Sequence, residues 1–195
     1  GAAGDLYLAA VSTKEYTPVT SVTGLGLTWT RVDAQCAGRS QTGVEVWMAQ
    51  GAPSGDGVVQ ATLEDAPLTA VLTVARYSDV PADTPLGSVI SANTNGLNGA
   101  CTGGTDSDEY DLNIAVSSGD SLVVAAVGKR RRDLTPGTGY ALRSDITADS
   151  GSVGDDSSVA LLDRVAGPLT NVRVRGVLSS SSDWAVITVE ILPME

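Results

Sequence analysis

The stretch GDSLVVAAVGK at residues 119–129 decides the fold prediction, because the chain opens on a close copy of it, GDLYLAAVSTK at residues 4–14. Each copy carries an Ala-Ala-Val triplet followed by a lysine and then by a Thr-Pro pair. A second match lies about 115 positions apart as well, between TAVLTVARYS from Thr69 and WAVITVEILP from Trp184. Two matches at one spacing indicate an internal repeat.

The repeat predicts the domain organisation. We expect two similar four-strand units, near residues 4–80 and 119–193, joined by residues 81–118 within a single domain of residues 1–195. Four short strands present an apolar face that water cannot cover, and two such sheets can cover each other. The prediction is therefore one body closed over a shared interior.

Short apolar runs bounded by Gly, Pro, Asp and Ser recur along the chain, and no run of comparable length has helical periodicity. This pattern predicts an all-β fold, a two-sheet antiparallel β-sandwich that is jelly-roll-like. An immunoglobulin-like sandwich is the alternative, although its buried Cys, Trp and Cys arrangement is missing. Alternation along the repeated strand predicts two inward sets, one of Ala185, Ile187, Val189 and Ile191, and one of Ala70, Leu72 and Val74.

Composition and charge exclude several classes of partner. The chain has 12 Lys plus Arg against 23 Asp plus Glu, a formal net charge of -11, and this field repels phosphate backbones and anionic lipid. No apolar run approaches the roughly 18 residues of a membrane-spanning helix. We therefore expect neither a nucleic-acid partner nor membrane insertion.

Two cysteines, Cys36 and Cys101, each follow or precede a strand-like run and sit among small turn residues. A disulfide between them is one interpretation and two buried thiols the other. A disulfide would imply an oxidising compartment, outside the cell or on its surface.

The chain contains no histidine, which removes the Ser-His-Asp triad, the Cys-His pair and the common zinc sites. No phosphate-binding glycine loop is present either. We therefore predict that the protein is not an enzyme. A pair of carboxylates acting on a polysaccharide is the one catalytic arrangement left open.

An acidic segment, TDSDEYD, brings Asp106, Asp108 and Asp111 close together in the sequence, and hard cations such as calcium bind carboxylate clusters. The three residues are candidate metal ligands, and calcium is the candidate cofactor. The match to an EF-hand loop is poor, and a solvated turn is the alternative. Asp149, Asp155 and Asp156 form a weaker candidate of the same kind.

A basic run and two tryptophans are candidate contacts for a ligand or partner. The basic run consists of Lys129, Arg130, Arg131 and Arg132, and it either forms a solvated loop or meets an acidic neighbour. Alternation places Trp47 and Trp184 on the face opposite the apolar set of their strands. An exposed tryptophan can stack on a sugar or anchor an interface, whereas one that caps a core edge does neither.

Five phrases carry a family resemblance when taken in order: VTSVTGLGLTWTRV, GVEVWMAQGAPSGDG, TAVLTVARYSDV, NTNGLNGACTGGTDSDEY and DWAVITVEI. Together they resemble a jelly-roll-like β-sandwich module of bacterial secreted and cell-surface proteins. The resemblance spans nearly the whole chain. It implies an extracellular, non-enzymatic module, and it transfers no catalytic or binding residue.

These observations lead to three hypotheses about function. The first is a structural or adhesive protein of the cell exterior, a subunit of a filament or surface layer that binds further copies of itself through exposed strand edges. The second is a carbohydrate-binding module that stacks glycans on Trp47 or Trp184 with the help of calcium. The third and weakest is a polysaccharide hydrolase.

Overall fold

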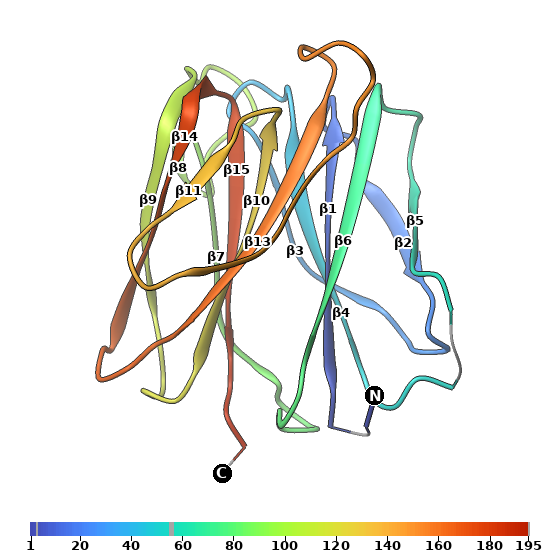
Figure 1. Cartoon of the computed structure of the whole chain (residues 1–195), viewed down its shortest axis with the longest axis vertical. Helices are drawn as coiled ribbons and strands as arrows, with labels where there is room; N and C mark the ends of the chain where they lie inside the picture. The colour runs from blue at the N-terminus through green and yellow to red at the C-terminus, as the bar shows by residue number, and fades with distance from the viewer. Residues whose placement is uncertain (3, 55–56, 195) are drawn as a thin grey trace.

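Four stacked β-sheets make up the computed structural model, which describes residues 1–2, 4–54 and 57–194 (Figure 1). Every strand pair in it is antiparallel, and the described residues contain no helix. The predicted all-β antiparallel sandwich is therefore confirmed, while its jelly-roll-like topology stays a prediction. In the described part of the chain there is thus no helix that could cross a membrane.

Two inner sheets form the middle of the stack. The first inner sheet has the order β3 (Thr30–Cys36), β4 (Gly43–Gln50), β1 (Leu6–Lys14) and β6 (Thr69–Tyr77). The second inner sheet has the order β12 (Ala141–Thr147), β13 (Ser157–Val165), β10 (Leu122–Arg130), β15 (Trp184–Ile191), β7 (Leu86–Asn93) and β8 (Gly96–Leu97).

An outer sheet covers the far side of each inner sheet. The first outer sheet pairs β2 (Val19–Thr23) with β5 (Gln60–Leu63), and it lies on the right of Figure 1. The second outer sheet has the order β11 (Leu134–Pro136), β14 (Asn171–Ser182) and β9 (Ser107–Ala115), and it lies on the left.

The two ends of the chain use the same strand order. The strand order β3-β4-β1-β6 of the first inner sheet recurs in the second inner sheet as β12-β13-β10-β15. The pairing of β2 with β5 in the first outer sheet likewise recurs in the second outer sheet as the pairing of β11 with β14. Val19 pairs with Leu63 and Leu134 with Leu178, so both strands of the outer pair recur after 115 positions. The strands without a counterpart, β7, β8 and β9, come from the segment that joins the two units, and all three add to the second.

Three apolar interiors alternate with the four sheets. The central interior lies between the inner sheets and includes Leu8 of β1, Val46 of β4 and Ile187 of β15. One further interior lies under each outer sheet. Strands β1, β10 and β15 are covered on both faces, and their sequences are therefore almost continuously apolar.

One of the two predicted inward sets is correct. Ala185, Ile187, Val189 and Ile191 all lie in the central interior. The matching set of Ala70, Leu72 and Val74 is wrong, because Val71 faces the central interior and Val74 is 36% exposed. The sequence match aligned Val74 with Val189, whereas the strand pairing aligns it with Thr188, and a slip of one residue turns every side chain to the other face.

Candidate functional site: a slot beside strand β5

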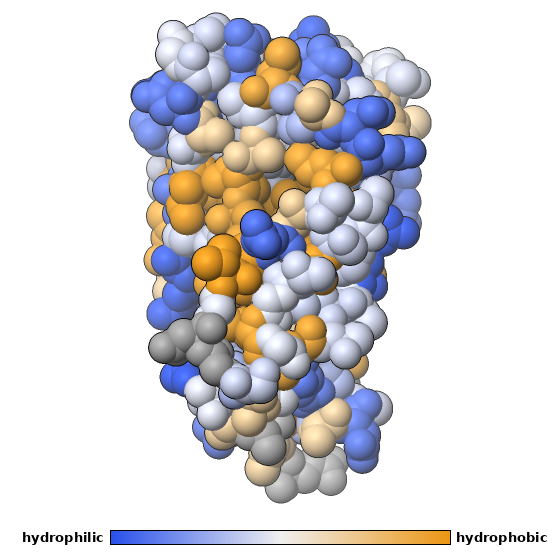
Figure 2. Space-filling view, turned by 90° about the vertical axis from the view of Figure 1, so that its right-hand side faces the viewer, coloured by the Kyte–Doolittle hydropathy of each residue, from blue (hydrophilic) through white to orange (hydrophobic). Residues whose placement is uncertain are grey.

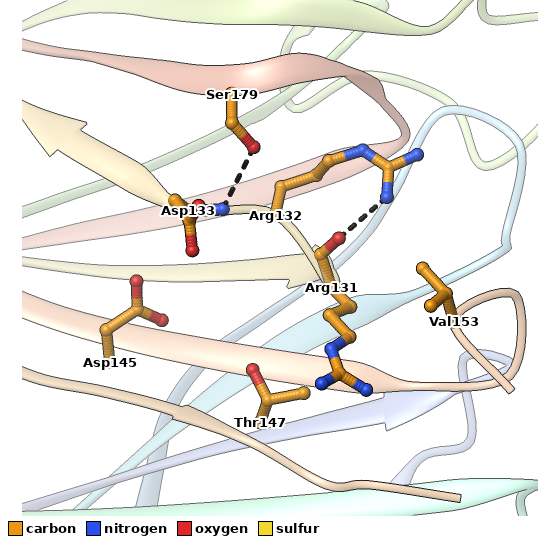
Figure 3. Close-up of a pocket in the computed structure, with 7 residues that line it drawn as sticks. All are labelled: Arg131, Arg132, Asp133, Asp145, Thr147, Val153 and Ser179. Carbon is orange, nitrogen blue, oxygen red and sulfur yellow. Dashed lines mark hydrogen bonds between the residues drawn. The ribbon is translucent and has the colours of Figure 1, made fainter. Parts of the chain in front are cut away.

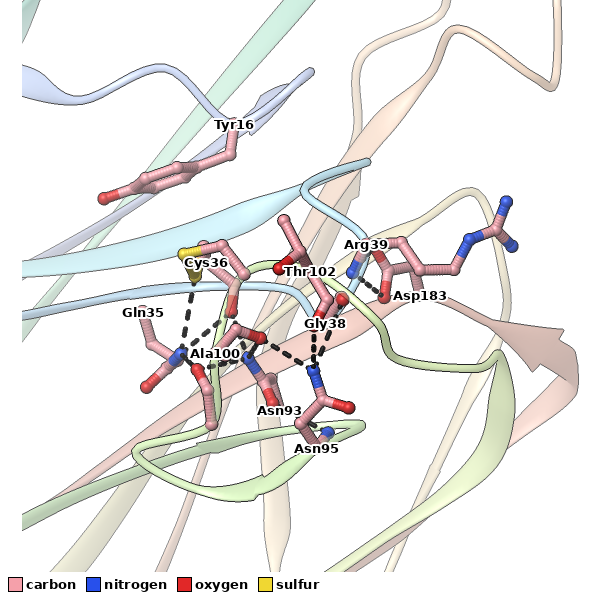
Figure 4. Close-up of a disulfide and its surroundings, with 12 residues drawn as sticks. Tyr16, Gln35, Cys36, Gly38, Arg39, Asn93, Asn95, Ala100, Thr102 and Asp183 are labelled. Carbon is pink, nitrogen blue, oxygen red and sulfur yellow. Dashed lines mark hydrogen bonds between the residues drawn. A yellow bond between two sulfur atoms is a disulfide. The ribbon is translucent and has the colours of Figure 1, made fainter.

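The predicted disulfide is present. Cys36 and Cys101 are joined, with their Cα atoms 5.4 Å apart, and the bond ties the end of β3 to the loop between β8 and β9 (Figure 4). The Asn93 side-chain amide donates to the backbone carbonyls of Cys36 at 2.9 Å and Gly99 at 2.8 Å. The disulfide and this amide hold one end of the first inner sheet against the joining segment.

Asp183 fixes the neighbouring loop from the side. Its carboxylate accepts a hydrogen bond from the backbone N–H of Arg39 at 3.0 Å (Figure 4). It accepts a second from the backbone N–H of Gln41, also at 3.0 Å. Burial raises the pKa of the Asp183 carboxyl, and these two backbone donors only partly offset the effect. These contacts join the loop after β3 to the segment that precedes β15.

The two candidate tryptophans are both buried. Trp47 is 8% exposed and Trp184 is 6% exposed, because outer sheets cover the faces that alternation predicted to be free. The Trp47 indole N–H donates to Glu45 at 3.2 Å. The prediction that either ring offers a platform for stacking a sugar is therefore wrong.

The basic run divides between the interior and the surface. Lys129 is fully buried and donates to Asp145 at 2.6 Å, and burial lowers the pKa of its ammonium group. Arg131 reaches Asp156 at 3.0 Å and Asp149 at 3.2 Å. Arg130 is half-buried at the end of β10.

Beside this run lies a hollow of about 570 Å³, lined by Arg131, Arg132, Asp133, Asp145, Thr147, Val153 and Ser179 (Figure 3). Its lining contains two arginines and two aspartates, and the Arg132 guanidinium donates to the backbone carbonyl of Arg131. The hollow therefore has no excess of one charge.

The three candidate metal ligands do not converge. Asp106 pairs with Arg39 at 2.9 Å, and Asp111 pairs with Arg173 on the neighbouring strand β14. Within the ranges that the structure describes, no three acidic or cysteine side chains are grouped to hold a metal ion. The described structure therefore does not bring Asp106, Asp108 and Asp111 together, since arginines pair with the first and the third.

A different feature stands out when the two outer sheets are compared. Strand β14 lies between β11 and β9, whereas β5 pairs with β2 alone as far as the described residues show. The other edge of β5 therefore carries backbone N–H and C=O groups without a strand partner. Such an edge is a template for adding another strand.

Strand β9 shows what covers the matching place in the second unit. Tyr110, Leu112 and Ile114 point from β9 into the interior and are at most 5% exposed. The Tyr110 ring meets that of Trp184 edge to face, with centroids 6.0 Å apart. Strand β9 thus lies over β15 and β7 and closes the interior.

The corresponding face of β6 in the first unit is open. Ala70 pairs with Thr13 and Trp184 pairs with Lys129, at matching ends of β1 and β10, so Ala70 occupies the place of Trp184. Ala70 is exposed and Leu72 is half-buried, while Trp184 and Val186 are buried under β9. We call this open strip between β5 and β6 the slot.

The slot is apolar and hollow. A depression of about 160 Å³ lies in it, lined by Val11, Val59, Ala61, Leu63, Ala70, Val71 and Leu72. Figure 2 looks onto this side of the molecule and shows apolar side chains gathered in a band with hydrophilic residues around it. Exposed Val58 (77%) and Leu68 (61%) lie beside it, just before the start of β5 and of β6 respectively.

Charge is absent from the slot although the chain is strongly acidic. Residues 57–63 and 66–75 contain no charged side chain, in a protein with a formal net charge of -11. An apolar, uncharged surface beside a free strand edge favours a polypeptide partner.

The sequence prediction did not include the slot, although one signal was available. The strand in EYDLNIAV lies outside both copies of the repeat, in the segment that joins them. A single additional strand can close one of the two units and not both.

Comparison of the chain with protein-family models, curated proteins and solved structures finds no match.

Proposed function

We propose that the protein is a non-enzymatic structural or adhesive module of the cell exterior, joined to a neighbouring subunit by a β-strand that the neighbour inserts into the slot. One observation carries this proposal. The second unit is closed by β9, and the first presents the same apolar face and strand edge without a covering strand in the described chain. Strand addition would supply both the backbone hydrogen bonds and the apolar cover.

The compartment is inferred from the disulfide and from the resemblance to secreted bacterial modules. Disulfides persist in oxidising surroundings, and the Cys36–Cys101 bond is part of the structural framework of this fold. A filament or surface layer is the form of assembly that we propose, with another copy of the chain as the neighbour.

The position of β6 sets a condition on the inserted strand. Strand β6 is the edge of its sheet, and β5 lies above β1, so β6 extends one strand beyond β5. If a second folded copy approached so that its β5 paired with this β5, the β6 strands of the two copies would collide. The slot therefore accepts a segment that extends away from the fold of its owner.

Light scattering on size-exclusion fractions and electron microscopy of the purified chain test the proposal. We expect species larger than the monomer at high concentration. Ala70→Lys places a charge on the exposed floor of the slot and should give monomers. Val165→Lys changes a residue that is 58% exposed on β13, and it should assemble like the wild type. A wild-type chain that stays monomeric at every concentration would contradict self-assembly.

A further inference from the structure

Strand β9 also indicates which strand the slot would take. The outer strands β5 and β14 correspond after 115 positions, so Ala61 occupies the place of Gly176 and Val59 that of Val174. Gly176 pairs with Tyr110 of β9, and Val174 pairs with Leu112. A strand added to β5 in the same register would place two apolar side chains against Ala61 and Val59.

At the end near Ala70, the slot has more room than the place that β9 covers in the second unit. In the second unit this end is filled by the ring of Trp184 and the ring of Tyr110 that packs on it. In the first unit the floor is Ala70, and the depression in the slot lies between this residue, Ala61 and their neighbours. The position that faces Ala61 and Ala70 therefore favours an aromatic side chain.

The outward face of the strand has a different requirement. In the second unit Arg175 of β14 pairs with Glu109 at 2.6 Å, and Arg173 of β14 pairs with Asp111. The acidic residues of β9 thus bind this strand to β14. The same shift of 115 positions puts Gln60 in the place of Arg175 and Val58 in that of Arg173. Acidic residues on an inserted strand would find no cation here and would meet a chain of net charge -11.

We infer that the slot binds a single extended segment that runs antiparallel to β5, with alternating apolar residues, an aromatic residue over Ala61 and Ala70, and no acidic residue within reach of Val58 and Gln60. This inference rests on the proposed function, because it describes the strand that a neighbour inserts. It also excludes β9 of another copy as the donor, since that strand carries Asp108, Glu109 and Asp111.

Fluorescence anisotropy with labelled synthetic peptides on the full chain tests this inference. The first peptide is the β9 sequence with its three acidic residues replaced by amides, SNQYNLNIA, and the second is the unchanged SDEYDLNIA. We expect saturable binding of the first with one site per chain, and binding of the second that is at least about tenfold weaker. Replacing the tyrosine of the first peptide by alanine should weaken its binding by about tenfold or more.

Variants of the protein locate the site. Ala70→Lys should abolish binding of SNQYNLNIA, while Val165→Lys on β13 should leave it unchanged. The double variant Val58→Arg/Gln60→Arg recreates the two cations of β14 on exposed positions and should restore binding of SDEYDLNIA. This exchange of preference is a result that non-specific apolar binding would not produce.

The outcomes separate the inference from the proposed function. Absence of binding for SNQYNLNIA up to millimolar concentration, insensitivity to Ala70→Lys, or equal affinity for both peptides would overturn the inference, even if the chain assembles. A chain that binds the uncharged peptide with these preferences but never self-associates would support the inference and contradict self-assembly.

Discussion

Tyr110 lies directly over Gly176, close enough that a methyl group on Gly176 would be 2.5 Å from the Tyr110 Cζ atom. The two residues are paired across β9 and β14, and the contact allows the aromatic ring to reach Trp184. In the first unit the residue at the place of Gly176 is Ala61 of β5, which has a methyl group. In the described chain no strand pairs with β5 on the side where β9 pairs with β14. The contact therefore marks one point where the two units differ.

Gly176→Ala should destabilise the protein by about 1–3 kcal/mol, because the added methyl overlaps a rigid ring in a closed interior. Chemical unfolding monitored by tryptophan fluorescence measures this loss. Gly154→Ala is the matched control, since its methyl would lie 3.8 Å or more from other atoms, and it should change stability by less than about 0.5 kcal/mol. In the double variant with Tyr110→Leu the two losses should be less than additive, and strict additivity would contradict the contact.

Removing the disulfide should cost stability without changing the fold. The Cys36→Ser/Cys101→Ser variant opens a loop with a sequence separation of 65, for which chain entropy predicts a loss of about 4 kcal/mol. Urea unfolding of the variant should agree with unfolding of the wild type in reductant. A loss below about 1 kcal/mol in both experiments would show that the bond contributes little to the framework.

Asp145→Asn should destabilise the protein more than Lys129→Met does. The asparagine leaves the fully buried Lys129 ammonium without its carboxylate partner, whereas the methionine removes the buried charge itself. We expect a loss of about 2 kcal/mol or more for Asp145→Asn at pH 7.

The pH dependence provides a second test of this ion pair. Burial lowers the pKa of Lys129, and removal of Asp145 lowers it further, so the unpaired ammonium of the Asp145→Asn variant loses its proton more readily as pH rises. The loss of stability of the Asp145→Asn variant relative to the wild type should therefore become smaller between pH 7 and pH 10. A larger loss for Lys129→Met than for Asp145→Asn would contradict the argument.

Glu190 should contribute stability that is lost in acid. Burial alone would raise the pKa of its carboxyl, but hydrogen bonds from Ser121, Ser117 and Ser88 outweigh burial and hold the pKa below its ordinary value of 4.5. The folded state therefore favours the carboxylate, and its contribution is complete above the unfolded pKa and disappears as pH falls through the folded pKa.

The Glu190→Gln substitution should consequently lower the free energy of unfolding by about 2 kcal/mol at pH 7. Below pH 4.5 the difference from the wild type should become smaller as the wild-type carboxyl takes up its proton. Thermal unfolding at a series of pH values measures this convergence. Asp108→Asn, at an exposed position, is the control, and a Glu190→Gln deficit that stays constant across the acid range would contradict the prediction.

Much of the strand content could be predicted from local pattern, because strand period and turn residues are properties of neighbouring residues. The apolar set of Ala185 to Ile191 was placed correctly for this reason. The number of layers was not predictable in the same way. Alternation tells which side chains share a face, but Trp47 and Trp184 show that it cannot tell whether another sheet covers that face.

By itself, the sequence determined that this chain builds antiparallel β-structure, that its two ends repeat one pattern, and that Cys36 and Cys101 were available to pair. Only in the folded chain do the repeats stack as four sheets, arginines pair with Asp106 and Asp111, and the joining strands close one unit and leave β5 and β6 of the other uncovered in the described residues. The physical reason is that pairing between strands far apart in the chain depends on register and coverage, which short-range residue patterns do not encode.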